Sequence, residues 1–217
     1  MDYQEEPNSF HPHHSPKGSN GLSFWNLREN FLRPTRIFEP NVFEGLNREA
    51  ALLCFALIET GCRPSELCNI LPENICLDAD VPHIRIRSTK ARQLKSQAPI
   101  RDVPLVGISL EAMKLARKGF PHYRERGYLL SQSLTKTFKA RKLMPSDNHR
   151  IYSFRHSFEN RMLEAGIDFG LRFTLMGHRN PRPEYGDGGS LAYRRDEMLK
   201  IVHPVSEDLL KGFPFNA

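Results

Sequence analysis

Residues 43–67 read FEGLNREAALLCFALIETGCRPSEL, and this stretch decides much of the fold. Between residues 43 and 60 the apolar side chains recur at the spacing of an α-helix, and Gly61 supplies a C-terminal stop. Pro64 is a favourable first residue for a second helix, because its fixed backbone angle suits a helix start. The pattern therefore predicts that Arg63 lies at the junction of two helices, close to an N-terminus.

Two short strands with a basic connection are predicted further along the chain. Residues 83–87 (HIRIR) alternate apolar and basic side chains, and residues 100–105 (IRDVPL) form a second short strand. The segment between them, STKARQLKSQAP, is polar, basic and turn-like. This arrangement favours an antiparallel β-hairpin.

The rest of the chain is predicted to be mainly helical. Gly166 and Gly177 are expected to end helices, and Asp168 and Ser190 are expected to cap helix N-termini. The expected helices cover residues 109–118, 131–142, 150–165, 168–176 and 190–202. Many helices with one small antiparallel sheet or hairpin indicate an α+β, mostly α-helical fold.

Composition narrows the class of partner. The 217 residues contain 31 Lys and Arg against 25 Asp and Glu, a formal charge of +6, which favours a polyanionic partner. No apolar run approaches the ~18 residues of a membrane span, and no signal peptide is recognisable, so we expect a cytoplasmic protein without a membrane partner.

The four cysteines (Cys54, Cys62, Cys68 and Cys76) form no CxxC pair. Structural thiols are therefore expected, without a metal site or a disulfide framework.

Residues 60–67, 152–156 and 175–178 form three separated blocks, which together resemble the catalytic domain of the tyrosine recombinases, the phage integrase family. Residues 60–67 (TGCRPSEL) match the TGxRxxEL-like turn that carries the first family arginine, and residues 152–156 (YSFRH) resemble the HxxRH-like start of a helix. Residues 175–178 (LMGH) resemble the block that supplies a histidine ahead of the family tyrosine. Lys90, just after the first predicted strand, is similar to the family lysine. The resemblance implies a fold that breaks and rejoins DNA.

The implied chemistry suits these residue types. Arg63 and Arg155 would bind the scissile phosphate, because a guanidinium stays charged and donates two parallel hydrogen bonds. Lys90 would protonate the leaving 5′-oxygen as general acid, and His178 would assist. A tyrosine would attack, forming a 3′-phosphotyrosine bond that conserves the energy of the broken link. Such a reaction requires no cofactor, no metal, no ATP and no small-molecule substrate.

Two positions depart from the family pattern. Tyr152 occupies the usual histidine position, where it can donate a hydrogen bond to phosphate but is a poor acid or base near neutral pH. The usual tyrosine follows the histidine by about nine residues, whereas Tyr185 follows His178 by seven and Tyr193 by fifteen. Tyr185 is the favoured nucleophile, because it is nearer the usual spacing and lies in a predicted loop. Tyr193 remains the alternative.

The resemblance also implies an organisation and a set of partners. Residues 1–35 are expected to form a flexible N-terminal arm or linker remnant, residues 36–203 the catalytic domain, and residues 204–217 a C-terminal tail. Double-stranded DNA is the expected partner, with self-association into a tetramer on DNA. Two alternatives stay open: a catalytically inert DNA-binding remnant that lacks the N-terminal clamp domain, and a relaxing enzyme similar to type IB topoisomerases.

Overall fold

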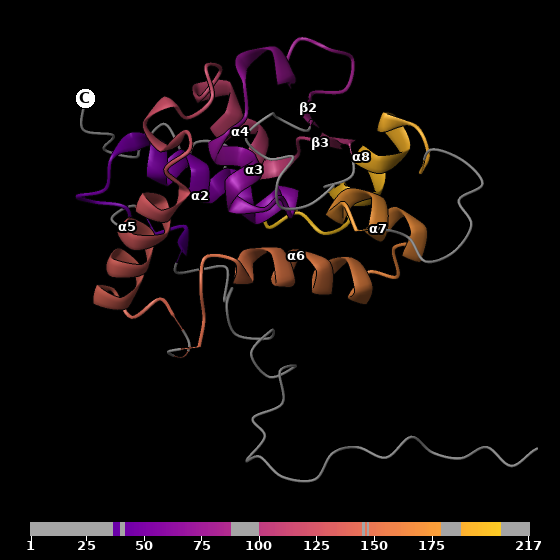
Figure 1. Ribbon diagram of the computed structural model, residues 1–217. Coiled ribbons are helices and arrows are strands. Elements are labelled where there is room, and N and C mark those ends of the chain that lie inside the picture. Colours follow the sequence, from indigo (N-terminus) through magenta and orange to yellow (C-terminus); the bar gives the residue numbers. More distant parts are fainter. Residues whose placement is uncertain are drawn as a thin grey trace, which may run out of the picture.

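A computed structural model describes residues 37–39, 42–87, 100–144, 146, 148–178 and 188–204. Its helices are α2 (Arg48–Thr60), α3 (Pro64–Cys68), α4 (Gly107–Leu115), α5 (Gly127–Ala140), α6 (Ser153–Glu164), α7 (Phe169–Met176) and α8 (Leu191–Leu199). Its other elements are the 3-10 turns η1 (Pro72–Asn74) and η3 (Pro121–Tyr123) and the strands β1 (Ile75–Cys76), β2 (His83–Ile86) and β3 (Arg101–Pro104). The predicted α+β, mostly helical fold is confirmed (Figure 1).

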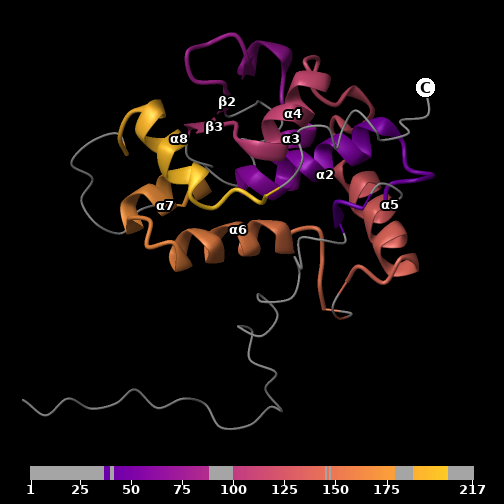
Figure 2. The ribbon, with the colours of Figure 1, turned by 180° about the vertical axis from the view of Figure 1, so that it is seen from behind.

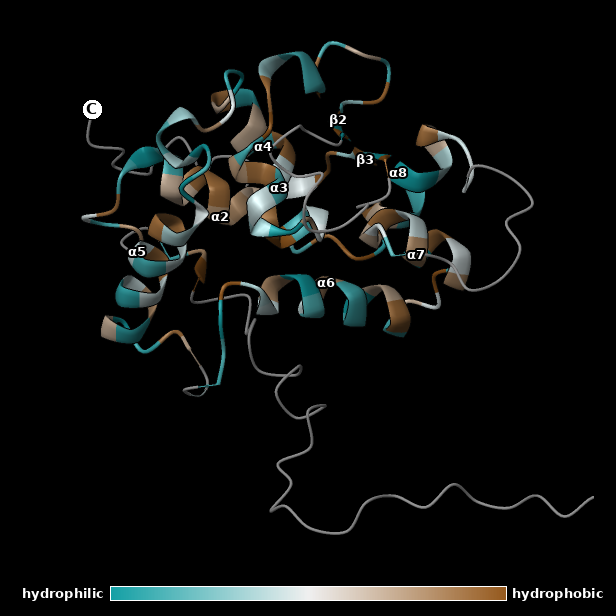
Figure 3. Ribbon diagram, in the orientation of Figure 1, coloured by the Kyte–Doolittle hydropathy of each residue, from teal (hydrophilic) through white to brown (hydrophobic). Residues whose placement is uncertain are grey.

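Helix α2 is the centre of the core. Every residue from Ala50 to Thr60 is buried, and α3, α4, α5 and α6 all pack against the helix. Its hydrophobic colouring in Figure 3 agrees with this position. The helix begins at Arg48 rather than at Phe43, because the Asn47 side chain accepts a hydrogen bond from the N–H of Ala50 (2.8 Å) and caps the helix there.

The sheet is antiparallel with the order β1-β2-β3. The sequence predicted the β2–β3 pair but not the two-residue strand β1. Ile84 lies opposite Val103, and both are buried, whereas Arg85 lies opposite Asp102 on the other face. Because alternate strand residues share a face, Arg101 points inward with Val103.

The C-terminal helices are fixed by the predicted caps. Asp168 accepts a hydrogen bond from the N–H of Leu171 (3.0 Å), and Ser190 accepts one from that of Tyr193 (3.1 Å). Helix α6 runs along one side of the molecule and packs on α2 and α7 (Figures 1 and 2). Helices α7 and α8 pack on β3, and Arg194 of α8 donates to the carbonyl of Asp102 (3.1 Å).

A buried polar cluster joins the central helix to the segment after α8. The Glu59 carboxylate bonds Nδ1 of His203 (2.6 Å) and Nη1 of Arg161 (2.9 Å). Burial alone would raise the pKa of Glu59, but the hydrogen bond from His203 and the charge of Arg161 hold this pKa below its ordinary value. The cluster therefore fixes α2, α6 and the chain near residue 203 to one another.

Two further expectations concern the state of the cysteines and helices that could span a membrane. Cys54, Cys62 and Cys68 are buried free thiols, as predicted, and Cys76 is half-buried. Within the described ranges, no helix is both long enough and apolar enough to span a bilayer.

Candidate active site

Arg63 is held at the start of α3 by the third residue of that helix. Its backbone N–H donates to Oε2 of Glu66 (2.8 Å), and its Nη1 donates to Oε1 of the same carboxylate (2.9 Å). Its Nη2 donates to the carbonyl oxygen of Gly177 (3.4 Å), at the end of α7. The side chain remains 26% exposed, so a ligand can reach this guanidinium.

Arg155 lies in the first turn of α6 and is only 2% exposed. Its Nη1 donates to the carbonyl of Gly61 (2.6 Å), and its Nη2 donates to the carbonyl of Met176. Met176 and Gly177 are adjacent in the chain. The two guanidinium groups named by the sequence, of Arg63 and Arg155, are therefore brought to the same turn.

A buried ion pair lies behind Arg63. Nη2 of Arg101 bonds Oε2 of Glu66 at 2.7 Å, and both side chains are almost completely buried. Burial alone would raise the pKa of Glu66, but the charges and hydrogen bonds of Arg101 and Arg63 lower this pKa to about 2. Glu66 is therefore ionised across the physiological range.

His178 follows the glycine that ends α7. Gly177 has a φ of 59°, in the left-handed region, and the N–H of His178 donates to the carbonyl of Phe173 (3.0 Å). Burial, followed by the positive charge of Arg155, lowers the pKa of His178 below its ordinary value of 6.5, while Glu159 acts in the opposite direction. The imidazole is therefore mainly neutral at pH 7 and able to accept a hydrogen bond or a proton.

Tyr152 lies at the N-cap of α6 and is 41% exposed. Its ring meets that of His156 edge-on, with centroids 5.4 Å apart, and its carbonyl accepts a hydrogen bond from the backbone N–H of Arg155 (3.1 Å). His149, one helical turn earlier in the chain, is buried with its Nδ1 bonded to Oγ of Ser146 (2.9 Å). His149 is therefore a buried residue whose ring bonds Ser146. Tyr152 lies at the surface, one helical turn before Arg155.

The remaining residues named by the sequence are Lys90, Tyr185 and Tyr193. Lys90 and Tyr185 lie outside the described residues. Tyr193 lies in the first turn of α8, is 44% exposed, and packs its ring against Gly189. The structure thus brings together Arg63, Arg155 and His178, with Tyr152 beside them.

Comparison with known proteins identifies the family. The family model for the phage integrase family matches residues 44–183, which is more than half of the chain. The chain belongs to the phage integrase family. No curated protein sequence matches this integrase-family chain.

Solved integrase structures share the fold of this family member. The integrase from mycobacterium phage Brujita superposes with a TM-score of 0.59 at 15% identity, covering 91% of this chain and 66% of that one. The Tn1549 transposon integrase, in complex with transposon right end DNA, gives a TM-score of 0.51 at 17% identity, covering 83% and 63%. This integrase-family chain therefore spans slightly less than two thirds of the length of these structures, and at such identities the likeness shows the fold.

Two residues that build this integrase-family site were not singled out from the sequence. Glu66 was noted only as part of the family motif, although its place three residues after Arg63 is the spacing of a capping carboxylate. Arg101 was included only as part of the predicted strand at residues 100–105. Its position two residues before Val103 was the available signal, since strand alternation turns both side chains to one face.

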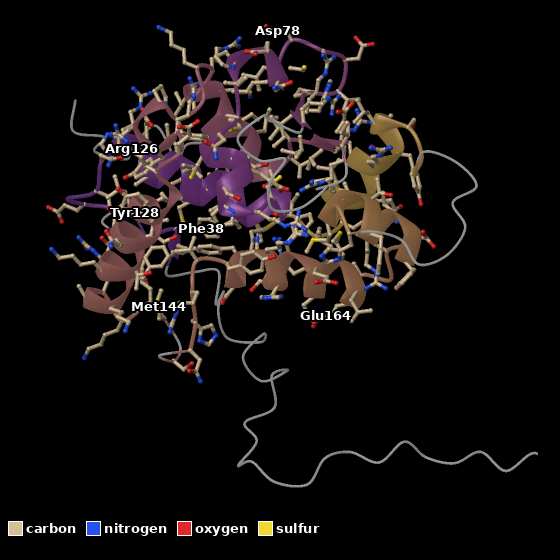
Figure 4. All side chains as sticks on the ribbon, in the orientation of Figure 1. Phe38, Asp78, Arg126, Tyr128, Met144 and Glu164 are labelled. Atoms are coloured by element: carbon tan, nitrogen blue, oxygen red, sulfur yellow. The ribbon has the colours of Figure 1, made fainter. Side chains whose placement is uncertain are left out.

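The integrase-family site carries an excess of positive charge. Arg63 and Arg101 both bond the carboxylate of Glu66, and Arg155 bonds the carbonyls of Gly61 and Met176 nearby. Figure 4 shows nitrogen atoms gathered between α3, α6 and α7. The neutral imidazole of His178 lies beside them. Chemically, such an arrangement can bind a phosphate group, stabilise further negative charge on its oxygens, and accept a proton nearby.

Proposed function

We propose that this integrase-family domain breaks and rejoins double-stranded DNA through a covalent 3′-phosphotyrosine intermediate. The observation that carries the proposal is the convergence of Arg63 and Arg155 on the Met176–Gly177 turn, next to His178. Negative charge grows on the non-bridging oxygens of a phosphodiester during its cleavage. Two fixed guanidinium groups stabilise that charge more in the transition state than in the ground state.

The proposed reaction forms one bond and breaks one bond in each direction. The phenolic oxygen of Tyr185 attacks phosphorus and gives up its proton, while the bond from phosphorus to the 5′-oxygen breaks. Lys90 donates a proton to that departing oxygen. In the reverse step the 5′-hydroxyl attacks the phosphotyrosine and releases the tyrosine. Tyr193 is the alternative nucleophile.

Two other side chains are proposed to assist. His178 would accept a hydrogen bond or the tyrosine proton, a role supported by the lowered pKa of its imidazole. Tyr152 would donate a hydrogen bond to a phosphate oxygen, a role supported by its exposure beside Arg155. Tyrosine here would replace the hydrogen bond of the usual histidine, but not its acid–base function near pH 7.

The proposal extends to organisation and partners. Residues 36–203 would be the catalytic domain, residues 1–35 an arm or linker, and residues 204–217 a tail. Double-stranded DNA would be the partner, with tetramers formed on DNA. The DNA partner is supported by the formal charge of +6 and by the Tn1549 integrase structures, which are DNA complexes.

The test is covalent trapping on a nicked suicide DNA substrate made from the sequences that flank the gene. We expect an adduct that resists denaturation and forms in EDTA, and that Tyr185→Phe abolishes. Tyr128→Phe is the matched control, because Tyr128 is an exposed tyrosine on α5. Loss of the adduct in Tyr193→Phe alone would identify Tyr193, rather than Tyr185, as the nucleophile.

Two further outcomes would favour the alternatives. The absence of an adduct on DNA that the protein demonstrably binds would contradict catalysis and favour an inert DNA-binding remnant. Relaxation of supercoiled plasmids of unrelated sequence would favour the topoisomerase-like activity.

A further inference from the structure

We propose that Arg101 is a positioning residue for strand cleavage, because it fixes Arg63 and the His178 turn to one another without touching DNA. This inference rests on the proposed function, which supplies the reaction that the positioning serves. The donors of the Arg101 guanidinium are directed into the protein, to both carboxylate oxygens of Glu66 and to the carbonyl of Leu175. Its effect must therefore pass through the residues that it holds.

The first contact is to the carboxylate that orients Arg63. Nη2 and Nη1 of Arg101 donate to Oε2 and Oε1 of Glu66 at 2.7 Å and 3.3 Å. The same two carboxylate oxygens accept from the backbone N–H and from Nη1 of Arg63. Glu66 is therefore held from both sides, and its position fixes the end of the Arg63 side chain.

The second contact is to the turn that carries His178. Nε of Arg101 donates to the carbonyl of Leu175 (2.9 Å), in the last turn of α7. A Cβ atom added at Gly177 would lie 2.4 Å from Nη1 of Arg101, so only glycine permits this approach. The guanidinium therefore packs directly against the turn whose carbonyls also receive Arg63 and Arg155.

The geometry requires a guanidinium rather than a positive charge alone. Arg101 makes hydrogen bonds in two directions from one rigid plane, to Glu66 and to Leu175. A lysine ammonium is a single point on a flexible chain and cannot span both acceptors. Arg101 also opens β3, the strand that follows the segment bearing Lys90.

Four variants separate positioning from simple stabilisation. Arg101→Lys keeps the charge, and Arg101→Met removes it. Arg161→Lys and Arg161→Met are matched controls, because Arg161 also forms a largely buried ion pair, with Glu59, and its side chain bonds Ile58, Glu59, Ile201 and His203. Circular dichroism would establish the temperature range in which each variant is folded, and all assays would be run within it.

The first readout is single-turnover cleavage of the nicked substrate beside affinity for intact DNA. We expect both Arg101 variants to cleave about 10- to 100-fold more slowly, since small misplacements of catalytic groups have effects of this size. Their DNA affinity should stay within about twofold of wild type, because the donors of Arg101 bond Glu66 and Leu175 within the protein. The Arg161 variants should cleave at the wild-type rate. Wild-type cleavage by Arg101→Lys would overturn the proposal.

The second readout requires no catalysis. In NMR spectra, the amide and imidazole signals of His178 should shift in Arg101→Lys and stay in place in Arg161→Lys. If wild type forms no adduct, the proposed function fails, and this measurement still decides the role of Arg101. Unchanged His178 signals in Arg101→Lys would overturn it.

Discussion

Glu66→Gln should change how the stability of the domain depends on pH. In the folded protein the pKa of Glu66 is lowered from 4.5 to about 2, because the favourable contacts with Arg101 and Arg63 exceed the cost of burial. A carboxyl with a lowered pKa stabilises the fold most above its unfolded pKa. That stabilisation is lost as the pH falls through the folded pKa.

The magnitude follows from these two pKa values, 4.5 unfolded and about 2 folded. Ionised Glu66 contributes about 3 kcal/mol to the free energy of unfolding at pH 7 and about 1 kcal/mol at pH 3. The glutamine side chain of the variant carries no charge at either pH. The stability gap between wild type and Glu66→Gln should therefore shrink by about 2 kcal/mol between pH 7 and pH 3.

Urea denaturation at both pH values, followed by circular dichroism, measures this gap. Glu111→Gln is the matched control, because Glu111 forms an ion pair with Lys114 at the surface, and we expect its loss to cost less than about 0.5 kcal/mol at pH 7. A Glu66→Gln gap that is equal at pH 7 and pH 3 would refute the reasoning. It would mean that Glu66 gains nothing from ionisation in the folded protein.

Two further changes test the local geometry by the same denaturation assay. Gly61→Ala should destabilise the fold by about 3 kcal/mol, because the φ of Gly61 is +60° and an added Cβ would lie 2.3 Å from Cδ1 of Phe158. Gly166→Ala is the control: the φ of Gly166 is +69°, but an added Cβ would have nothing within 4 Å, so this change should cost only about 1 kcal/mol. Equal costs would show that the Phe158 contact is unimportant. Ser190→Ala should lower the free energy of unfolding by about 1 kcal/mol, because it removes the acceptor for the N–H of Tyr193. Ser190→Asp supplies a new acceptor and should keep the wild-type stability; a loss of stability in Ser190→Asp equal to that in Ser190→Ala would exclude capping.

The features that the sequence predicted well are those governed by neighbours in the chain. Asp168 and Ser190 cap their helices and Gly61 ends α2 because each acts within about four residues of itself. The predicted start of α2 was wrong, and the cause is again an interaction between neighbours in the chain. The apolar spacing extends back to Phe43, and the capping amide of Asn47 overrides it.

The residues that pair across the chain could not be predicted in the same way. Glu66 and Arg101 are 35 positions apart, and no local periodicity links a carboxylate in a helix to an arginine in a strand. Arg63 and Arg155 were identified from the order of the motifs that resemble the family. Their approach to the Met176–Gly177 turn depends on the packing of α6 and α7. Charge partners of this kind are fixed only when the core has assembled.

The cluster of Glu59 and His203 has a consequence for synthesis on the ribosome. Glu59 is translated 144 residues before His203 and 102 residues before Arg161, and these two side chains bond its buried carboxylate. Until both have left the exit tunnel, burying α2 would leave a carboxylate without these partners in an apolar core, at a cost of several kcal/mol. We therefore expect compact packing around the central helix to be stabilised late in synthesis, once residue 203 becomes available to bond Glu59.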